Sequence, residues 1–400
     1  MKRHIKTAVY IILILLAVVS VIQGAKNALY YSQDFQYDAA LALRCGINPY
    51  EVSLSETGIM SQGPVAEFYR VFEEAGAPQK MEANQFPSLL MLLFPMTFLP
   101  YRAARVLWLI LNLLFTAGIC LLLRKTFLKD MQKDVFNMMM LLMLAGTPFR
   151  NQLGVGQHTL FSFFFFLLAV YLSEREKKVS SGLALAVSYF KYTLTAPLAV
   201  YFLYKRRFKE FIISLIPHVI LTAVGAAMLG KGFIDMIREP LKVSSLLAGE
   251  GSIDIGALSE GASISPVFTG IIMLGLVVMA FILPENEDDR FFSLLILLSL
   301  IMTYHRIYDF FVLTAASAGT VLMKAGKEGF DLKKLKRPEL AKGAMYCLLL
   351  LYFYFVLRIF GENRHALMAG AVLYYGYLIV YISFFRRDPS GSGTGGNDAG

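Results

Sequence analysis

Residues 181–204 read SGLALAVSYFKYTLTAPLAVYFLY, an apolar run with a single lysine near its middle. Basic residues flank the run on both sides, in segments 174–178 (EREKK) and 205–209 (KRRFK). Because basic residues mark the cytoplasmic ends of membrane spans, the run has to leave and return on the same side. Its 24 residues are too few for two full crossings at about 1.5 Å of helix rise per residue. The stretch therefore predicts a shallow pair of half-helices that breaks near Lys191–Pro197, which is tolerated where it lines a polar cavity.

The rest of the chain also has the composition of a membrane protein. Of its 400 residues, 56% are hydrophobic and 14% aromatic, and the mean hydropathy is +0.57. Runs of about 18 or more mostly apolar residues recur, long enough to cross roughly 30 Å of hydrocarbon. We predict an all-α, polytopic transmembrane bundle with about 10–13 membrane segments, short or re-entrant helices included. It forms one domain over residues 1–385, followed by a flexible cytoplasmic tail at 386–400 that is rich in Gly and Ser.

The distribution of charge predicts the topology. The net charge of +9 does not indicate a nucleic-acid-binding protein, because the cations cluster in short loops between apolar runs. The basic N-terminus precedes a long apolar run at 5–23, which we interpret as a retained first span with its N-terminus inside. Two long external loops follow, the first at 24–86 and the second at 230–265. The other expected spans are 105–123, 135–148, 157–172, 211–229, 266–283, 290–304, 309–323, 342–359 and 367–385.

Residues 86–100, FPSLLMLLFPMTFLP, are apolar but short and rich in proline. If this segment crossed the membrane, every later basic segment would face outward, against the cytoplasmic bias of basic residues. We therefore expect a re-entrant or interfacial helix hairpin at this point of the first loop.

With this topology, the unusual polar residues near the membrane fall on the external face. They come from four separate segments: Asp34, Asp38 and Arg44; Arg150, Gln157 and His158; Lys191; and His305, Arg306 and Asp309. Ionisable groups at membrane depth are costly, so they usually face a cavity and mark a site.

A structural role remains open for each of these residues. Asp34 could cap a helix that begins at YDAALALR, and Asp38 could lie on a solvated face. Lys191 could extend to the membrane interface. His158 could hydrogen-bond its own turn, and His305 could lie at the interface without any chemical role.

A carboxylate beside a cavity can accept a proton from a hydroxyl, and fixed cations in a dry pocket can neutralise a departing phosphate. An apolar groove between spans can hold a lipid tail. These parts favour a transferase that moves a sugar from a lipid phosphate to an acceptor hydroxyl. The alternatives are a membrane transporter or lipid flippase, for which broken helices are also typical, and a non-catalytic assembly subunit.

Five stretches, taken in order, resemble glycosyltransferase family 87. They are DFQYDAALALRCGINPY (34–50), FPSLLMLLFPMTFLPYRAARVLWLILN (86–112), GVGQHTLF (154–161), SGLALAVSYFKYTLTAPL (181–198) and YHRIYDFFVL (304–313). That family belongs to the GT-C glycosyltransferases, which are polytopic and use polyprenyl-phosphate sugars, typically mannose. The resemblance implies a helical bundle of GT-C type. The chain departs from the family pattern at Ser88, where a second proline is common, and at Arg306, a charge directly after the histidine.

The resemblance also implies roles for individual residues. Asp34 would be the general base of a single inverting displacement, and Lys191 and His305 would bind the donor phosphate. Supporting or substrate-binding positions would be Tyr37, Arg44, Asn48, Gln157, His158 and Asp309. The partners implied are a polyprenyl-phosphate-linked sugar, a glycolipid or glycan acceptor of the envelope, and membrane lipid. The site would lie on the external face of the bacterial cytoplasmic membrane, and we expect no cofactor and favour no metal, because Asp34 is the one carboxylate assigned to the chemistry.

Overall fold

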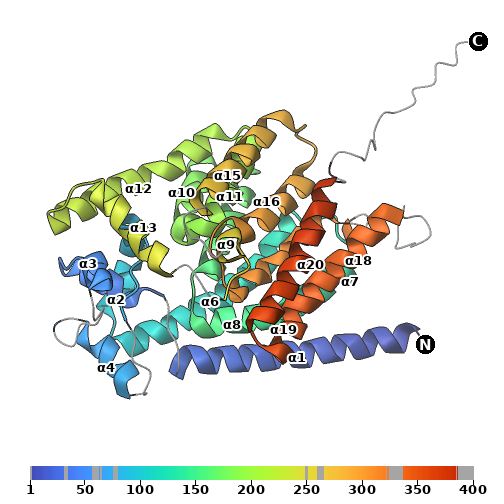
Figure 1. Cartoon of the computed structure of the whole chain (residues 1–400), viewed down its shortest axis with the longest axis horizontal. Coiled ribbons are helices and arrows are strands. Elements are labelled where there is room, and N and C mark those ends of the chain that lie inside the picture. The colour runs from blue at the N-terminus through green and yellow to red at the C-terminus, as the bar shows by residue number, and fades with distance from the viewer. Residues whose placement is uncertain are drawn as a thin grey trace, which may run out of the picture.

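The computed structural model describes residues 2–30, 35–55, 63, 65–74, 80–247, 251–258, 265–320, 322–323, 337–383 and 385. Within these ranges the chain is helical, with no strand apart from an isolated bridge between Ser252 and Arg306. The prediction of an all-α, polytopic membrane bundle is confirmed (Figure 1). The elements are α1 (Lys2–Tyr30), α2 (Tyr37–Arg44), α3 (Pro49–Leu54), α4 (Ala66–Glu74), α5 (Pro87–Leu90), η1 (Met91–Phe98), α6 (Tyr101–Lys125), α7 (Lys133–Ala145), α8 (Thr147–Val155), α9 (Thr159–Ser173), α10 (Lys178–Ser188), η2 (Tyr189–Lys191), α11 (Tyr192–Tyr204), α12 (Phe208–Leu229), α13 (Asp235–Leu247), α14 (Ile255–Leu258), α15 (Ser265–Ile282), α16 (Asp288–Met302), η3 (Ile307–Gly319), α18 (Arg337–Leu351), η5 (Tyr352–Val356), α19 (Leu357–Phe360) and α20 (Arg364–Ser383).

By length and composition, six helical segments of the described chain could cross a membrane, and a seventh if the bent pair α8 and α9 is one span. One of the six, Lys178–Tyr204, folds back on itself. A straight helix of this length would place its ends about 40 Å apart. Instead, Glu176 just before it and Arg207 just after it form an ion pair of 2.7 Å. The predicted pair of half-helices, α10 and α11, is therefore confirmed.

The break in this hairpin lies at Lys191. Residues 189–191 form a single 3₁₀ turn, and Lys191 leaves the helical region with φ −109° and ψ 67°. Pro197 lies inside α11, so it does not mark the break. The lysine is thus the apex of the two half-helices.

In residues 86–100, α5 is followed directly by η1, so the two form one short helical segment. The prediction of a helix hairpin in this stretch is therefore wrong. Both flanks of this segment contact the first loop. The Tyr50 hydroxyl donates to the carbonyl of Gln85 at 2.8 Å, and the Tyr37 hydroxyl donates to that of Leu99 at 2.8 Å. Since both ends stay beside the same loop, the expectation that the segment does not cross the bundle is confirmed.

Two boundaries differ from the sequence predictions. The first helix runs to Tyr30, beyond the expected end at residue 23, and in this extension Gly24 packs closely on the backbone of Arg150 and on Leu153. The connector expected between the spans 135–148 and 157–172 is largely helix α8, which meets α9 at 105°. Gly156 makes this bend with a left-handed φ of 75°, and its carbonyl accepts a 2.7 Å hydrogen bond from the Trp108 indole.

The basic segments gather at one end of the bundle. Lys6 pairs with Asp134 at 2.6 Å, and Lys205 pairs with Asp288 at 3.0 Å. The loop helices α2, α3 and α4 lie with α13 at the opposite end, on the left of Figure 1. There the first loop contacts the second, since Asn48 donates to Glu239 at 2.9 Å. The segments thus alternate between two ends in the order that the charges predict; residues 324–336 and 386–400 lie outside the described chain.

Candidate active site

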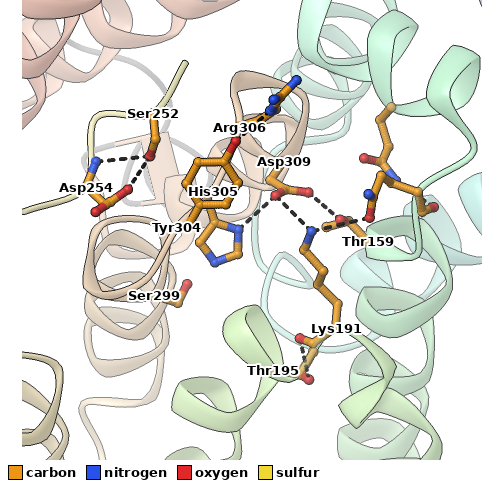
Figure 2. Close-up of polar contacts among 12 residues, drawn as sticks. Thr159, Lys191, Thr195, Ser252, Asp254, Ser299, Tyr304, His305, Arg306 and Asp309 are labelled. Carbon is orange, nitrogen blue, oxygen red and sulfur yellow. Dashed lines mark hydrogen bonds and ion pairs between the residues drawn. The ribbon is translucent and has the colours of Figure 1, made fainter. Parts of the chain in front are cut away.

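Asp309 is the centre of a buried polar cluster at the end of the bundle that carries the long loops. It lies in the first turn of η3, and its side chain is fully buried. One carboxylate oxygen lies 2.8 Å from His305 Nδ1 and 3.4 Å from Lys191 Nζ. The other oxygen accepts a hydrogen bond from the Thr159 hydroxyl. One acid therefore joins the start of α9, the apex of the α10–α11 hairpin and the turn before η3 (Figure 2).

Lys191 is held inside this cluster. Its backbone N–H donates to Ser162 Oγ at 2.8 Å, which fixes the hairpin apex against α9. Its ammonium lies 3.4 Å from Gln157 Oε1 and 5.7 Å from the centre of the Tyr308 ring. The side chain is 13% exposed and points toward Asp309, so the interpretation of Lys191 as an interfacial residue is wrong (Figure 2).

His305 is also fully buried and points toward the same carboxylate (Figure 2). Asp309 is an acceptor when ionised, so the proton of the imidazole lies on Nδ1. The other nitrogen, Nε2, is buried and has no hydrogen-bond partner among the described residues. A neutral ring can accept a hydrogen bond there, and a protonated ring can donate one.

An aromatic wall adjoins the cluster. The His158 ring lies 4.2 Å from the Phe190 ring and 5.7 Å from Trp108, measured between ring centres. Phe35 stacks on the same indole at 5.4 Å. Asp34, the predicted base, directly precedes Phe35 in the sequence and lies outside the described residues. The chain next to the predicted base is therefore anchored on this wall.

The described contacts of three other first-loop positions stabilise the loop. The Tyr37 hydroxyl bonds to the carbonyl of Leu99, as above. Asn48 accepts from the Tyr50 N–H at 3.0 Å and so caps α3. The Arg44 guanidinium lies 4.4 Å from the centre of the Phe98 ring. None of these described contacts reaches the Asp309 cluster.

Asp38 is a buried carboxyl that the sequence interpretation missed. It was expected on a solvated face, but it is 6% exposed and accepts a 3.1 Å hydrogen bond from the Tyr69 hydroxyl. Burial raises the pKa of Asp38 to about 6, although its hydrogen bonds with Ala39 and Tyr69 act in the opposite direction. The usable signal was the run of Ala and Leu around it, because every residue of α2 from Tyr37 to Leu43 is buried.

Among the described residues, no group of three or more His, Cys, Asp or Glu side chains is placed to hold a metal ion. Asp34 is not part of that set, so the absence of a metal stays a prediction. The groups that are placed together, an ammonium, an imidazole and a carboxylate, can bind an anion and move a proton.

A comparison with family models matches the chain over residues 87–305 to glycosyltransferase family 87. The match includes Lys191 and His305, and it ends just before Asp309. No curated protein and no solved structure matches the chain. The family model covers more than half of the 400 residues and agrees with the polytopic helical fold. The chain belongs to glycosyltransferase family 87 and is therefore a membrane glycosyltransferase.

Proposed function

We propose that this glycosyltransferase moves mannose from a polyprenyl-phosphate donor to a hydroxyl of an envelope glycolipid or glycan, with inversion. The reaction takes place on the external face of the bacterial cytoplasmic membrane, and the end with the basic segments faces the cytoplasm. One observation carries the proposal: an ammonium and an imidazole are buried together beside one carboxylate, at the end that holds the long loops.

The charges of this cluster suit a lipid-phosphate donor. Lys191 and Asp309 cancel one another, so the cluster is neutral with a neutral His305 and carries one positive charge when His305 is protonated. A sugar linked through a phosphodiester carries one negative charge, and its phosphate gains a second as the sugar departs. A cation that is held in place before the reaction stabilises that added charge more strongly in a dry site than in water. His305 Nε2, which has no described partner, donates a hydrogen bond to the phosphate when the ring is protonated.

Asp34 acts as the general base. It takes the proton of the acceptor hydroxyl, whose oxygen attacks the anomeric carbon while the bond from that carbon to the phosphate oxygen breaks. The electron pair of that bond stays on the polyprenyl phosphate. Support comes from Phe35, the next residue, which is anchored on the Trp108 wall beside His158. Asp38 is the second candidate base, because its pKa of about 6 is close to a working pH, but its carboxyl is engaged by Tyr69.

The test is sugar transfer in liposomes with a radiolabelled polyprenyl-phosphate mannose and an envelope lipid extract as acceptor. We expect Asp34→Asn to lose roughly 10²- to 10⁴-fold in rate, the range of general base catalysis. Asp38→Asn is the matched control, because it removes a carboxyl from the same loop and should retain transfer. Wild-type transfer by a folded Asp34→Asn protein would overturn the assignment of the base. Transfer from a nucleotide sugar but not from the lipid donor would overturn the donor class, and lipid movement without transfer would favour the flippase alternative.

A further inference from the structure

A separate cavity of about 410 Å³ lies at the other end of the bundle, among the basic segments. Its charged and polar lining comes from several elements and consists of Lys129, Ser173, Glu174, Tyr201, Lys205, Arg207 and Asp288. Helix α11 runs from the apex at Lys191 to this cavity, a distance of about 20 Å at the rise of an α-helix. The cavity is thus distinct from the candidate active site.

Two ion pairs hold the walls of the cavity. Lys205 pairs with Asp288 at 3.0 Å, and Arg207 at the rim pairs with Glu176 at 2.7 Å. These contacts connect the end of α11 with the start of α16 and with the turn after α9. The cavity is therefore built from fixed parts of the bundle.

Other lining groups are left for a ligand. Lys129 and Glu174 are both exposed, and neither side chain forms a hydrogen bond or an ion pair within 4 Å among the described residues. The Tyr201 side chain is 5% exposed, yet its hydroxyl has no hydrogen-bond partner in the described chain. Burial raises the pKa of Glu174, although the positive charges of Lys129, Arg175 and Lys205 act in the opposite direction. The cavity therefore offers an ammonium and a hydroxyl to an acceptor, and a carboxylate to a donor.

From this lining we infer a binding site for a phosphodiester whose far end carries a hydrogen-bond donor, an amine or a hydroxyl. Because Lys205 is paired with Asp288 and Arg207 with Glu176, one ammonium, Lys129, and one carboxylate, Glu174, remain, and they match the negative phosphate and the donor at the far end of the headgroup. Lys129 and the Tyr201 hydroxyl bind the phosphate oxygens, and Glu174 accepts a hydrogen bond from the far end of the headgroup. The apolar side chains of Val170 and Phe202 line the same cavity and lie beside the glycerol of the lipid.

The source of this phosphodiester is a phospholipid of the leaflet at the basic end. Basic pockets between membrane helices on the cytoplasmic side are suited to lipid headgroups. Phosphatidylethanolamine and phosphatidylglycerol carry the required donor, whereas phosphatidylcholine does not. The inference does not depend on the sugar donor or on the base proposed above, because no group is shared with the Asp309 cluster.

The experiment measures which lipids remain bound to the purified full-length protein in native mass spectrometry. The protein is equilibrated with equal amounts of phosphatidylcholine, phosphatidylethanolamine and phosphatidylglycerol. We expect one of the two donor-bearing lipids to be retained over phosphatidylcholine. Lys129→Ala should lower the retained fraction about fivefold, the effect of one cation at a membrane surface. Lys133→Ala removes the same charge from the same end, outside the cavity, and should leave retention unchanged.

Glu174→Ala tests the other half of the site, because it should remove the preference over phosphatidylcholine without abolishing binding. Equal retention by wild type, Lys129→Ala and Lys133→Ala would overturn the proposal, and so would a wild type with no preference among the three lipids. A parallel arm adds soluble glycerophosphoglycerol or glycerophosphoethanolamine. If these raise the unfolding temperature of the wild type as much as the lipids do, and Lys129→Ala removes the effect, the site is supported with a free phosphodiester as its ligand.

Discussion

At the scale of single residues, Asp309 is the centre of the candidate site, because its carboxylate holds Lys191 and His305 together. Lys191 and His305 were singled out because ionisable groups at membrane depth are costly, and both are buried at one carboxylate. Asp309 was expected only to support them, yet it is the residue that joins them. Asp38 was misjudged because its burial depends on how α2 packs, which no local pattern of charge reveals. The central position of Asp309 and the burial of Asp38 both depend on contacts between distant segments, which the sequence does not show.

Replacing Asp309 should weaken catalysis by disturbing His305. In Asp309→Asn the side-chain oxygen can still accept from Nδ1, but the negative charge beside His305 and Lys191 is lost. We expect kcat to fall roughly 10- to 100-fold, the effect of one hydrogen bond to a charged group. Thr159→Val, which removes one donor to the same carboxylate, should show a smaller fall in kcat in the same assay. A wild-type kcat in folded Asp309→Asn would contradict this role.

Asp38 should make the stability of the protein depend on pH. Its pKa is about 6 in the folded chain, against an ordinary value of 3.8, so the folded state binds this proton more tightly than the unfolded state. The contribution of this group to stability is therefore greatest below about pH 4 and is lost as the pH rises through about 6. Asp38→Asn should raise the unfolding temperature above pH 6 and leave it unchanged near pH 4. A thermal unfolding series in detergent across this range measures the difference, and a constant offset at all pH values would contradict the assignment.

At the scale of elements, the positions of the basic residues predicted the arrangement of the helices better than hydropathy did. The α10–α11 hairpin was predicted from the basic residues on both of its sides, although its composition alone resembles one long span. The last turns of α1 were missed, and so was helix α8, because polar residues such as Arg150 and Gln157 suggested an external turn. The local signals for α8 were present, since Pro148 stands in its first turn and Gly156 at its end.

The close packing of α10 on α12 gives a prediction at this scale. A Cβ atom at Gly182 would lie 2.8 Å from the backbone oxygen of Glu210 and 2.6 Å from Ile213 Cγ2. Gly182→Ala should therefore push the two helices apart and destabilise the protein by about 1–3 kcal/mol, seen as a lower unfolding temperature. Gly275→Ala in α15 is the matched control, because a Cβ there meets no atom within 4 Å. Equal unfolding temperatures for the two variants would show that the α10–α12 contact is looser than described.

At the scale of the whole molecule, the Asp309 cluster and the separate cavity lie at opposite ends of the helical bundle. The end with the long loops holds the Asp309 cluster, and the end with the basic segments holds the 410 Å³ cavity. The order of the segments was predictable from the sequence, because charged loops alternate with apolar runs. The pairing of distant loops, such as Asn48 with Glu239, was not predictable, since it depends on tertiary contacts.

The central claim is that the buried cluster at Asp309 binds the phosphate of a polyprenyl carrier. The most direct measurement is the dissociation constant of the purified protein for a polyprenyl phosphate, compared between wild type, Lys191→Met and His305→Gln. We predict that each substitution weakens binding by at least about tenfold, the loss of one hydrogen bond to a charged group, while Lys133→Met binds as wild type does. Wild-type affinity in both cluster variants, with unfolding temperatures that show folded protein, would contradict the claim.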